Sequence, residues 1–312
     1  MSDRPAKIAV VGSYNVGLTM SVPRFPVGGE TIIGQSFAEG PGGKGSNQAI
    51  AATRLGAETS FVGKVGADQY GDDAVELWES EGVDATHVSR VTGAHTGVAF
   101  IIVNEDGENE ITVAPGANDM LDPNTIGTAS DVIEDSDCLL LQLEIPDEPL
   151  ITAAEIASDA GVPVILNPAP ARELPTSLLE NVAYLTPNES EALVLTGRDP
   201  DTDVSHERLT RELIGLGVET AVMTQGAAGA VLVTENEMIS IDAPSVPVAD
   251  TTGAGDAFNG AFAVALGEGK PPAEAVEFAC RAGALEVTEE EVIPGLPERD
   301  EVDTMAGGSI GE

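Results

Sequence analysis

The stretch Asp250-Thr251-Thr252-Gly253-Ala254-Gly255-Asp256 runs directly into Ala257–Leu266, an apolar segment with the composition of a helix. Small residues before a helix leave its first backbone N–H groups free to face an anion, and the helix dipole strengthens that attraction. Asp256 stands at the same entrance and can reach a hydroxyl presented to the anion. The stretch therefore predicts phosphoryl transfer to an alcohol, with Asp256 as the base. The alternative is a glycine-rich turn in which Asp256 only caps the helix.

Around this stretch, short β-rich runs alternate with helical patterns. The predicted strands are Lys7–Val11, Cys138–Leu143, Val162–Leu166, Val182–Thr186 and Thr220–Thr224. Glu148–Ala160 and Ser205–Leu216 are predicted crossover helices between them. This alternation is typical of an α/β fold with a mostly parallel sheet and helices on both faces.

Two early segments depart from the alternation. Residues 14–40 are rich in turn residues, and residues 96–114 are predicted to form two strands joined by a turn. We expect them to build a small β-sheet lid that projects from the α/β body. The whole chain, residues 1–312, is expected to be one domain.

The charge balance is strongly acidic, with 53 acidic residues against 14 basic ones and a net charge of −39. The acids are spread along the chain, as in proteins adapted to molar salt, where the screening length falls to about 3 Å. We therefore expect a halophilic protein. No basic patch is present to neutralise phosphates, so nucleic acid is not an expected partner.

The longest apolar runs are far too short to cross a bilayer, and no signal peptide is evident. Cys138 and Cys280 are isolated from other metal-ligand residues and are expected to be small buried side chains. These features predict a cytoplasmic protein without a membrane partner.

A second glycine-rich segment, Gly40–Gln48, opens the apolar helix Ala49–Leu55. It is not a P-loop, because Gly45 follows Lys44 where that motif needs Ser or Thr. Its glycines permit close approach to a ligand, and Asn47 offers both a donor and an acceptor. The alternative is a tight turn.

Two further motifs follow predicted strands. Thr186–Glu191 places Asn188 and Glu191 where α/β sheets bind ligands, although a helix cap explains it equally well. Thr224–Gly229 is a glycine turn between two strands. It is either a plain hairpin or a contact to nucleotide phosphate or ribose.

The combination is similar to one known family. The stretches that carry the likeness are Gly12-Ser13, Asn15, Phe25-Pro26, Gly29-Glu30-Thr31, Gly42–Gly45, Asn47-Gln48-Ala49, Gly107-Glu108-Asn109, Gln142-Leu143-Glu144, Asn167–Pro175 and Phe258-Asn259-Gly260. Together with Asp250–Asp256 they resemble the ribokinase family of carbohydrate kinases, also called the PfkB family, over nearly the whole chain. The likeness is greatest to the ribokinase branch.

The resemblance implies a Rossmann-like body, a lid that often forms a homodimer contact, and a set of site residues. Asp256 becomes the catalytic base, and Gly253, Ala254 and Gly255 form the anion hole. The residues implied to line the sugar site are Asn15, Gly43, Lys44, Asn47 and Glu144. Asn188 and the turn containing Thr224, Gly226 and Gly229 would hold ATP. Glu191 would organise Mg²⁺ through water, and Asp250 and Thr252 would belong to a site for a monovalent cation such as K⁺.

The chain departs from the family pattern at Gly17, where the family has a sugar-binding aspartate. Losing a carboxylate that holds two hydroxyls should weaken the binding of free ribose by a few kcal/mol. We therefore expect a pentose or pentose phosphate as acceptor, with ribose 1-phosphate as the anionic candidate. Candidate phosphate contacts are Arg24, Lys44, His95 and Arg172. If a nearby loop replaces the aspartate, ribose itself remains the substrate.

A second departure is Glu289-Glu290-Glu291, where the family has a basic-Gly-Ala stretch near its cation site. A glutamate here either adds a ligand for K⁺ or is halophilic surface charge. The leading prediction remains an ATP-dependent sugar kinase. The alternatives are a nucleoside kinase of the same family and a non-catalytic sugar sensor.

Overall fold

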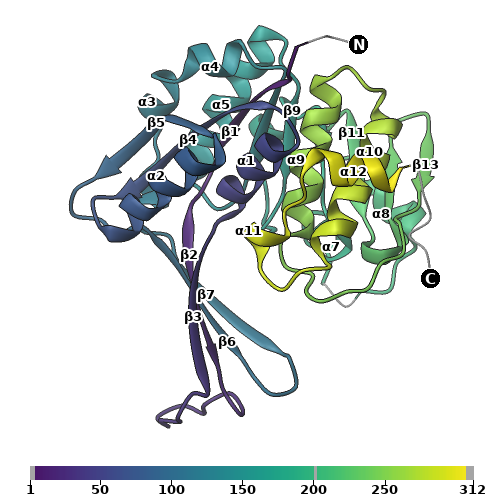
Figure 1. Ribbon diagram of the computed structural model, residues 1–312. Coiled ribbons are helices and arrows are strands. Elements are labelled where there is room, and N and C mark those ends of the chain that lie inside the picture. The colour runs from purple at the N-terminus through teal and green to yellow at the C-terminus, as the bar shows by residue number, and fades with distance from the viewer. Residues whose placement is uncertain (1–3, 200–201, 307–312) are drawn as a thin grey trace.

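The body of the protein is a nine-stranded sheet, shown in Figure 1. The computed structural model describes residues 4–199 and 202–306. In sheet order the strands are β13 (Met238–Ile241), β12 (Ala230–Val233), β11 (Thr220–Thr224), β10 (Tyr184–Leu185), β9 (Val164–Asn167), β8 (Cys138–Gln142), β1 (Lys7–Val11), β4 (Glu58–Gly66) and β5 (Asp84–Val91). Pairing is parallel from β11 to β5, while β12 pairs antiparallel with both of its neighbours.

Helices cover both faces of this sheet, because its strands are apolar on both sides. In β1, Ile8 and Val10 belong to one core cluster, whereas Ala9 and Val11 belong to the other. The first cluster is covered by α1 (Lys44–Arg54), α2 (Gln69–Glu81), α9 (Ala254–Gly267), α10 (Pro272–Glu286), α11 (Val292–Gly295) and α12 (Arg299–Met305). The second is covered by α3 (Pro123–Gly127), α4 (Ser130–Glu134), α5 (Asp147–Ala160), α6 (Thr176–Leu179), α7 (Glu189–Leu195) and α8 (His206–Ile214). The predicted α/β fold with a mostly parallel, two-sided sheet is confirmed.

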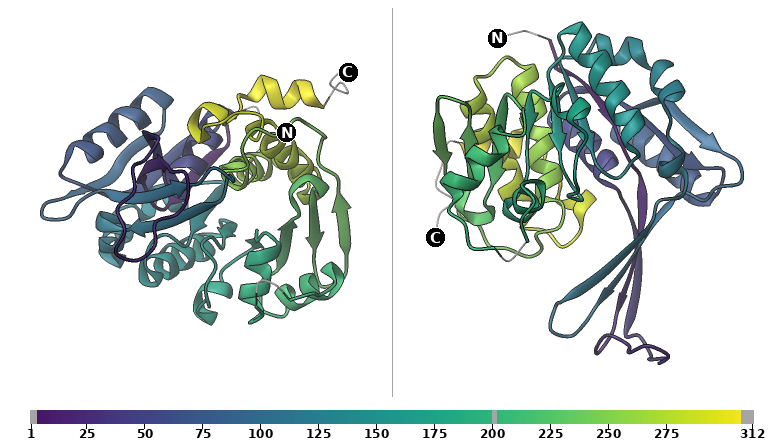
Figure 2. Two further views of the ribbon diagram at one scale, coloured as in Figure 1. Left: turned by 90° about the horizontal axis from the view of Figure 1, so that it is seen from below. Right: turned by 180° about the vertical axis from the view of Figure 1, so that it is seen from behind.

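A second, four-stranded sheet projects from one end of the body (Figures 1 and 2). It contains β3 (Ser36–Gly42), β2 (Asn15–Ser21), β6 (Gly97–Val103) and β7 (Asn109–Ala114). Since side chains alternate along a strand, Asn15 and Gly17 of β2 lie on one face, and Leu18 and Met20 on the other. Three of these strands fall within the two segments that were expected to form the lid, and β3 extends two residues beyond the first segment.

Most predicted elements occur where the sequence indicated. The helix predicted over Ala49–Leu55 starts five residues earlier, at Lys44. Two predicted strands differ for local reasons. The strand predicted over Val162–Leu166 starts at Val164, after Pro163, whose nitrogen has no hydrogen to donate to a ladder. The strand predicted over Val182–Thr186 is reduced to Tyr184–Leu185, because the Val182 N–H bonds to Leu179 O and extends the turn after α6.

The chain changes direction across the sheet at β1. From β1 it builds β4 and β5 on one side, and it later adds β8 and the remaining strands on the other. Ligands of open α/β sheets bind at the carboxyl ends of strands where the order reverses. The residues just after β1 and β8, Gly12-Ser13 and Leu143-Glu144, lie at that point.

Candidate active site

Asp256 is held by two side chains from another helix. It lies in the first turn of α9 and is 5% exposed. Asn47 Nδ2 donates to Oδ2 of Asp256 at 2.8 Å, and Gln48 Nε2 donates to Oδ1 at 2.9 Å. Each carboxylate oxygen therefore has one amide donor, which fixes the plane of the carboxylate and leaves lone pairs for a ligand.

Gln48 is itself fixed by a buried chain of amides that the sequence did not reveal as part of the site. Gln142 Nε2 donates to Gln48 Oε1 at 2.6 Å, and Gln48 Nε2 also donates to Asn167 Oδ1 at 3.1 Å. The available signal was a glutamine at the end of the apolar strand Cys138–Gln142. Asn47 Oδ1 is buried without a partner among the described residues, so it can accept a hydrogen bond from a ligand hydroxyl.

Hydrogen bonds to Glu144 link the start of β2 to the start of α1. Its Oε2 accepts from Ser13 Oγ at 2.5 Å, Asn15 Nδ2 at 3.2 Å and the Lys44 N–H at 3.0 Å. Within the described residues all three bonds end on Oε2, which leaves Oε1 for a ligand. Asn118, for which the sequence gave no signal, donates to Asn15 Oδ1 at 3.0 Å and orients that amide.

Lys44 places a positive charge among these carboxylates. Burial acts to lower its pKa, but Asp256, Glu144 and Glu191 outweigh burial and raise the pKa above the ordinary value. The ammonium group therefore stays charged at neutral pH. The other candidate phosphate contacts have partners elsewhere: Arg24 binds Glu30, Arg172 binds Asp147, and His95 contacts Thr96 O.

Gly17 leaves open space beside residues that the sequence suggested for a sugar site. It pairs with Gly40 and Ala99, and a Cβ built on it would come no closer than 3.6 Å to Gly40 O and 3.7 Å to Ile101 Cδ1. No carboxylate of the described neighbours occupies that space.

Asn188 and Glu191 form a capping box at the start of α7. Asn188 Oδ1 accepts from the Glu191 N–H, and Glu191 Oε2 accepts from the Asn188 N–H, both at 2.8 Å. The structural interpretation of this motif is thus confirmed. Burial raises the pKa of Glu191, and among nearby charges Lys44 lowers it while Asp256 raises it, so the three groups lie within electrostatic reach of one another.

A pocket of about 440 Å³ adjoins this cap, and its lining includes Asn188, Thr224, Gly226 and His206. The turn after β11 is a hairpin with one 3₁₀ turn, η2 (Gly226–Ala228). Gly229 is required there because its φ is +96° and a Cβ would lie 2.0 Å from Ile241 O.

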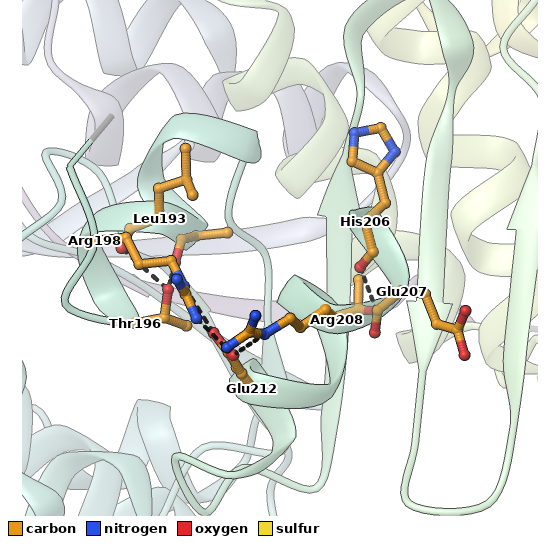
Figure 3. Close-up of polar contacts among 9 residues, drawn as sticks. Leu193, Thr196, Arg198, His206, Glu207, Arg208 and Glu212 are labelled. Carbon is orange, nitrogen blue, oxygen red and sulfur yellow. Dashed lines mark hydrogen bonds and ion pairs between the residues drawn. The ribbon is translucent and has the colours of Figure 1, made fainter. Parts of the chain in front are cut away.

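An ion pair links α8 to the segment that follows α7, beside this pocket. Figure 3 shows Arg198, just after α7, and Arg208 converging on Glu212 of α8, with N–O distances of 2.8 to 2.9 Å. Arg208 and Glu212 both lie in α8, so only Arg198 connects α8, which carries His206 and Leu209 at the pocket, to the chain after α7.

The loop before α9 is stabilised by Asp250, whose Oδ1 accepts from the Thr252 N–H at 3.0 Å and from Thr252 Oγ1 at 2.9 Å. Gly253 follows with φ +95° and caps α9, so Gly253, Ala254 and Gly255 present the free N–H groups of that helix. Glu289, Glu290 and Glu291 are exposed, which agrees with surface charge.

Comparison with known proteins decides the family. The model of the pfkB family carbohydrate kinases matches residues 5–299. The chain belongs to this family. Ribokinase from Haemophilus influenzae is 40% identical over 294 residues, covering 94% of this chain and 96% of the relative. The predicted family and enzyme class, an ATP-dependent sugar kinase, are confirmed.

Solved structures of pfkB family kinases agree with this assignment. Ribokinase from Thermotoga maritima superposes with a TM-score of 0.89 at 36% identity, covering 97% of this chain and all of the other. Arabidopsis thaliana ribokinase, solved with ribose and ATP, has a TM-score of 0.89 at 34% identity, covering 98% of this chain and 100% of that one. Within residues 4–199 and 202–306, no helix could cross a membrane.

The close packing before α1 generates a prediction. Gly43 has φ +92°, and a Cβ there would lie 2.6 Å from Asn15 N. We expect Gly43→Ala to destabilise the protein by about 1–3 kcal/mol, because the strained backbone and the clash add together. Chemical denaturation measures this change. Gly40→Ala, on the adjoining strand with nothing within 4 Å, is the control and should change stability by less than about 0.5 kcal/mol. Equal effects of the two changes would contradict the packing argument.

Proposed function

We propose that this kinase transfers the γ-phosphoryl group of ATP to the primary hydroxyl of a pentose or pentose phosphate, with Asp256 as general base. The observation that carries the proposal is the orientation of Asp256. Asn47 and Gln48 hold its carboxylate at the entrance of α9, beside the free N–H groups of Gly253–Gly255.

The reaction follows from this arrangement. The acceptor hydroxyl gives its proton to Asp256, its oxygen bonds to the γ-phosphorus, and ADP leaves with the electrons of the broken P–O bond. The N–H groups at the start of α9 stabilise the charge on the equatorial oxygens. Lys44, which lies near both Asp256 and Glu191, adds a positive charge. Asn15, Asn47 and Glu144 orient the sugar through its hydroxyls.

ATP and Mg²⁺ are assigned to the residues around the start of α7 and the pocket beside it. We assign the nucleotide to Asn188 and the hairpin with Thr224, Gly226 and Gly229, which line or adjoin the 440 Å³ pocket. The Glu191 carboxyl group lies within electrostatic reach of Lys44 and Asp256, and carboxylate oxygen with water suits Mg²⁺. Bound Mg²⁺ would neutralise phosphate charge. Asp250 and Thr252 are assigned to a monovalent cation such as K⁺, since Asp250 Oδ2 accepts no bond within the described residues.

Asp256→Asn tests the base. The amide keeps the shape of the side chain but cannot take the proton, so we expect kcat to fall by about 10²- to 10⁴-fold. ADP release in concentrated KCl, with circular dichroism to confirm folding, measures the effect. Asp159→Asn, an exposed change of the same kind on α5, should leave kcat unchanged. Full activity of Asp256→Asn would exclude the proposed role.

The identity of the sugar that accepts the phosphoryl group depends on Gly17. Without a carboxylate beside Gly17, the pocket lacks a hydrogen-bond partner for two hydroxyls of ribose. It also lacks one negative charge, so it repels an anionic sugar less. Both effects favour an anionic acceptor such as ribose 1-phosphate over ribose. Lys44 is the charged group placed to attract it. Kinetics with both sugars decide between them, and a strong preference for free ribose would exclude ribose 1-phosphate.

Gly17→Asp tests this dependence directly, because the space around Gly17 can hold the new side chain. We expect KM for ribose to fall about tenfold or more, since each hydrogen bond to a charged group contributes about 1.5–3 kcal/mol. The rate on ribose 1-phosphate should fall through charge repulsion. Gly17→Asn, of similar size but neutral, is the control and should not reduce that rate comparably. No change in acceptor preference with Gly17→Asp would contradict the assignment.

A homodimer through the lid is the assembly we propose. Met20, Phe37 and Phe100 share the face opposite Gly17 and are 42%, 60% and 54% exposed. A thin sheet with apolar side chains in water gains stability when a second copy covers it.

Replacing Phe37 and Phe100 together by Ser should convert the dimer to a monomer, because the apolar contact is lost. Light scattering after size-exclusion chromatography measures the mass. Met120→Ser, an exposed apolar change outside the lid, should leave the mass unchanged. A wild-type monomer at all concentrations would contradict the proposal.

A further inference from the structure

A glutamine with no surface open to a substrate stands at one end of the amide chain behind Asp256. Gln142 is the last residue of β8 and is 0% exposed, whereas Asp256 belongs to the first turn of α9. Between them lies Gln48 of α1, which is also 0% exposed. Gln142 therefore acts on the carboxylate only through Gln48.

The side-chain amide of Gln48 could occupy its site in two ways, because its oxygen and nitrogen are nearly the same size. Its Nε2 donates to Asp256 Oδ1 at 2.9 Å and to Asn167 Oδ1 at 3.1 Å, so both N–H groups are used. Turning the amide by 180° would place Gln48 Oε1 against two oxygens, one of them a carboxylate oxygen. Asp256 would then lose a donor and gain a repulsive contact.

Asn167 keeps its oxygen toward Gln48 because its nitrogen is engaged elsewhere. Asn167 Nδ2 donates to Thr186 O at 3.4 Å, which leaves Oδ1 for Gln48. Asn167 is the register partner of Gln142 at the ends of β9 and β8, so their side chains leave the same face of the sheet. The two strand ends thus present an acceptor to the nitrogen of Gln48 and a donor to its oxygen.

That donor leaves an oxygen of Gln142 in an unfavourable place. Gln142 Nε2 donates to Gln48 Oε1 at 2.6 Å. Gln142 Oε1 is buried without a partner among residues 4–199 and 202–306, and a Cβ built on Gly12 would lie 2.1 Å from it. A buried oxygen without a hydrogen bond destabilises a protein. The opposite orientation of Gln142 would put two acceptor oxygens face to face, so the unpartnered oxygen is the consequence of presenting an N–H group to Gln48.

We propose that Gln142 is a positioning residue for phosphoryl transfer, which fixes the Gln48 amide so that an N–H group, and not the oxygen, faces Asp256. The carboxylate then keeps one amide donor on each oxygen and the orientation in which it accepts the proton of the substrate hydroxyl. The inference rests on the proposed function, because the group on which Gln142 acts is the proposed base.

Gln142→Met tests the proposal, since it keeps the length of the side chain and removes the donor. We expect kcat to fall about 10- to 100-fold, because the Gln48 amide is free to turn away from a charged partner. KM for the sugar should change less than about threefold, because Asn47 and Glu144 stay in place. ADP release in concentrated KCl measures both constants, and circular dichroism confirms folding.

Gln69→Met is the matched control. Gln69 is an exposed glutamine whose Nε2 donates to Asp73 Oδ1 at 2.7 Å, so the change removes the same kind of bond far from the amide chain. Both kcat and KM should stay at their wild-type values.

Gln142→Glu tests the direction of the hydrogen bond. While the new carboxyl group is protonated it can donate to Gln48 Oε1, but once ionised it can only accept, and it turns the Gln48 amide around. We therefore expect the ratio of variant to wild-type kcat to be highest at acidic pH and to fall as the pH rises. Taking the ratio cancels the ionisations that both proteins share.

The charges around this position set the sign of that pH effect. Burial and the neighbouring acids favour the protonated form of the new carboxyl group, whereas Lys44 opposes it. One of these acids, Glu286, is the last residue of α10 and is 1% exposed, and a Cβ built on Gly253 would lie 2.2 Å from its Oε1. The charged groups that act on Asp256 or lie beside it are Lys44, Glu144, Glu191 and Glu286.

A double-mutant cycle with Asp256→Asn separates positioning from a general structural effect. If Gln142 acts through the base, Gln142→Met should lower kcat in the wild-type background but leave the slow residual rate of Asp256→Asn unchanged. If Gln142→Met does not fold, the pH dependence of Gln142→Glu provides the decisive measurement.

Three results would overturn the proposal: wild-type kcat in Gln142→Met, equal losses in both backgrounds of the cycle, or a kcat ratio for Gln142→Glu that does not change with pH. Loss of activity in Asp256→Asn together with full activity in Gln142→Met would reject the positioning role alone. Full activity in Asp256→Asn would reject the proposed base and, with it, the group on which Gln142 acts.

Discussion

The contact between the first turns of α1 and α9 determines where the chemistry takes place. Asn47 and Gln48 reach Asp256 only because the two helices pack closely, with Gly260 so near Ala51 that an added Cβ would lie 2.7 Å from it. Two N-terminal helix dipoles then point into one space and attract an anion. A carboxylate would be repelled by that anion, so under the proposed function the neutral amide donors that orient Asp256, together with Lys44, would allow base and phosphate to share the space.

The sequence predicted those parts of the protein that depend on local pattern. Strand β1 could be predicted from an apolar run, and the start of the helix that carries Asp256 from the glycines before it. Gln48, Gln142 and Asn118 could not be recognised as partners in the site, because their hydrogen bonds join segments about 90 residues or more apart in sequence. For Asn188 and Glu191 the sequence fitted both a helix cap and a ligand site. The capping box shows that the cap is present, and the charge of Lys44 still acts on the Glu191 carboxyl group.

Glu286 was missed for a different reason. It continues the stripe of buried residues formed by Ala275, Ala279 and Ala282 along α10, at helical spacing. An acid on an apolar stripe is a signal, but in a chain with 53 acidic residues it does not stand out from the surface charges around it. Burial is what distinguishes Glu286 from the acidic residues on the surface. Exposed glutamates such as Glu289–Glu291 are screened by salt, whereas a buried one is not and must be neutralised locally.

Two features bear on the charge on either side of Asp256. At Gly17 no carboxylate is present on the proposed acceptor side, which lowers the cost of bringing a second negative group close to the transferred phosphate. At Glu286 a carboxyl group lies behind the Gly253 turn, where burial raises its pKa to about 8 and so favours its neutral form at neutral pH. Under the proposed assignments, the site can accept an anionic substrate only if the negative charge of the protein's own carboxyl groups is kept low or compensated.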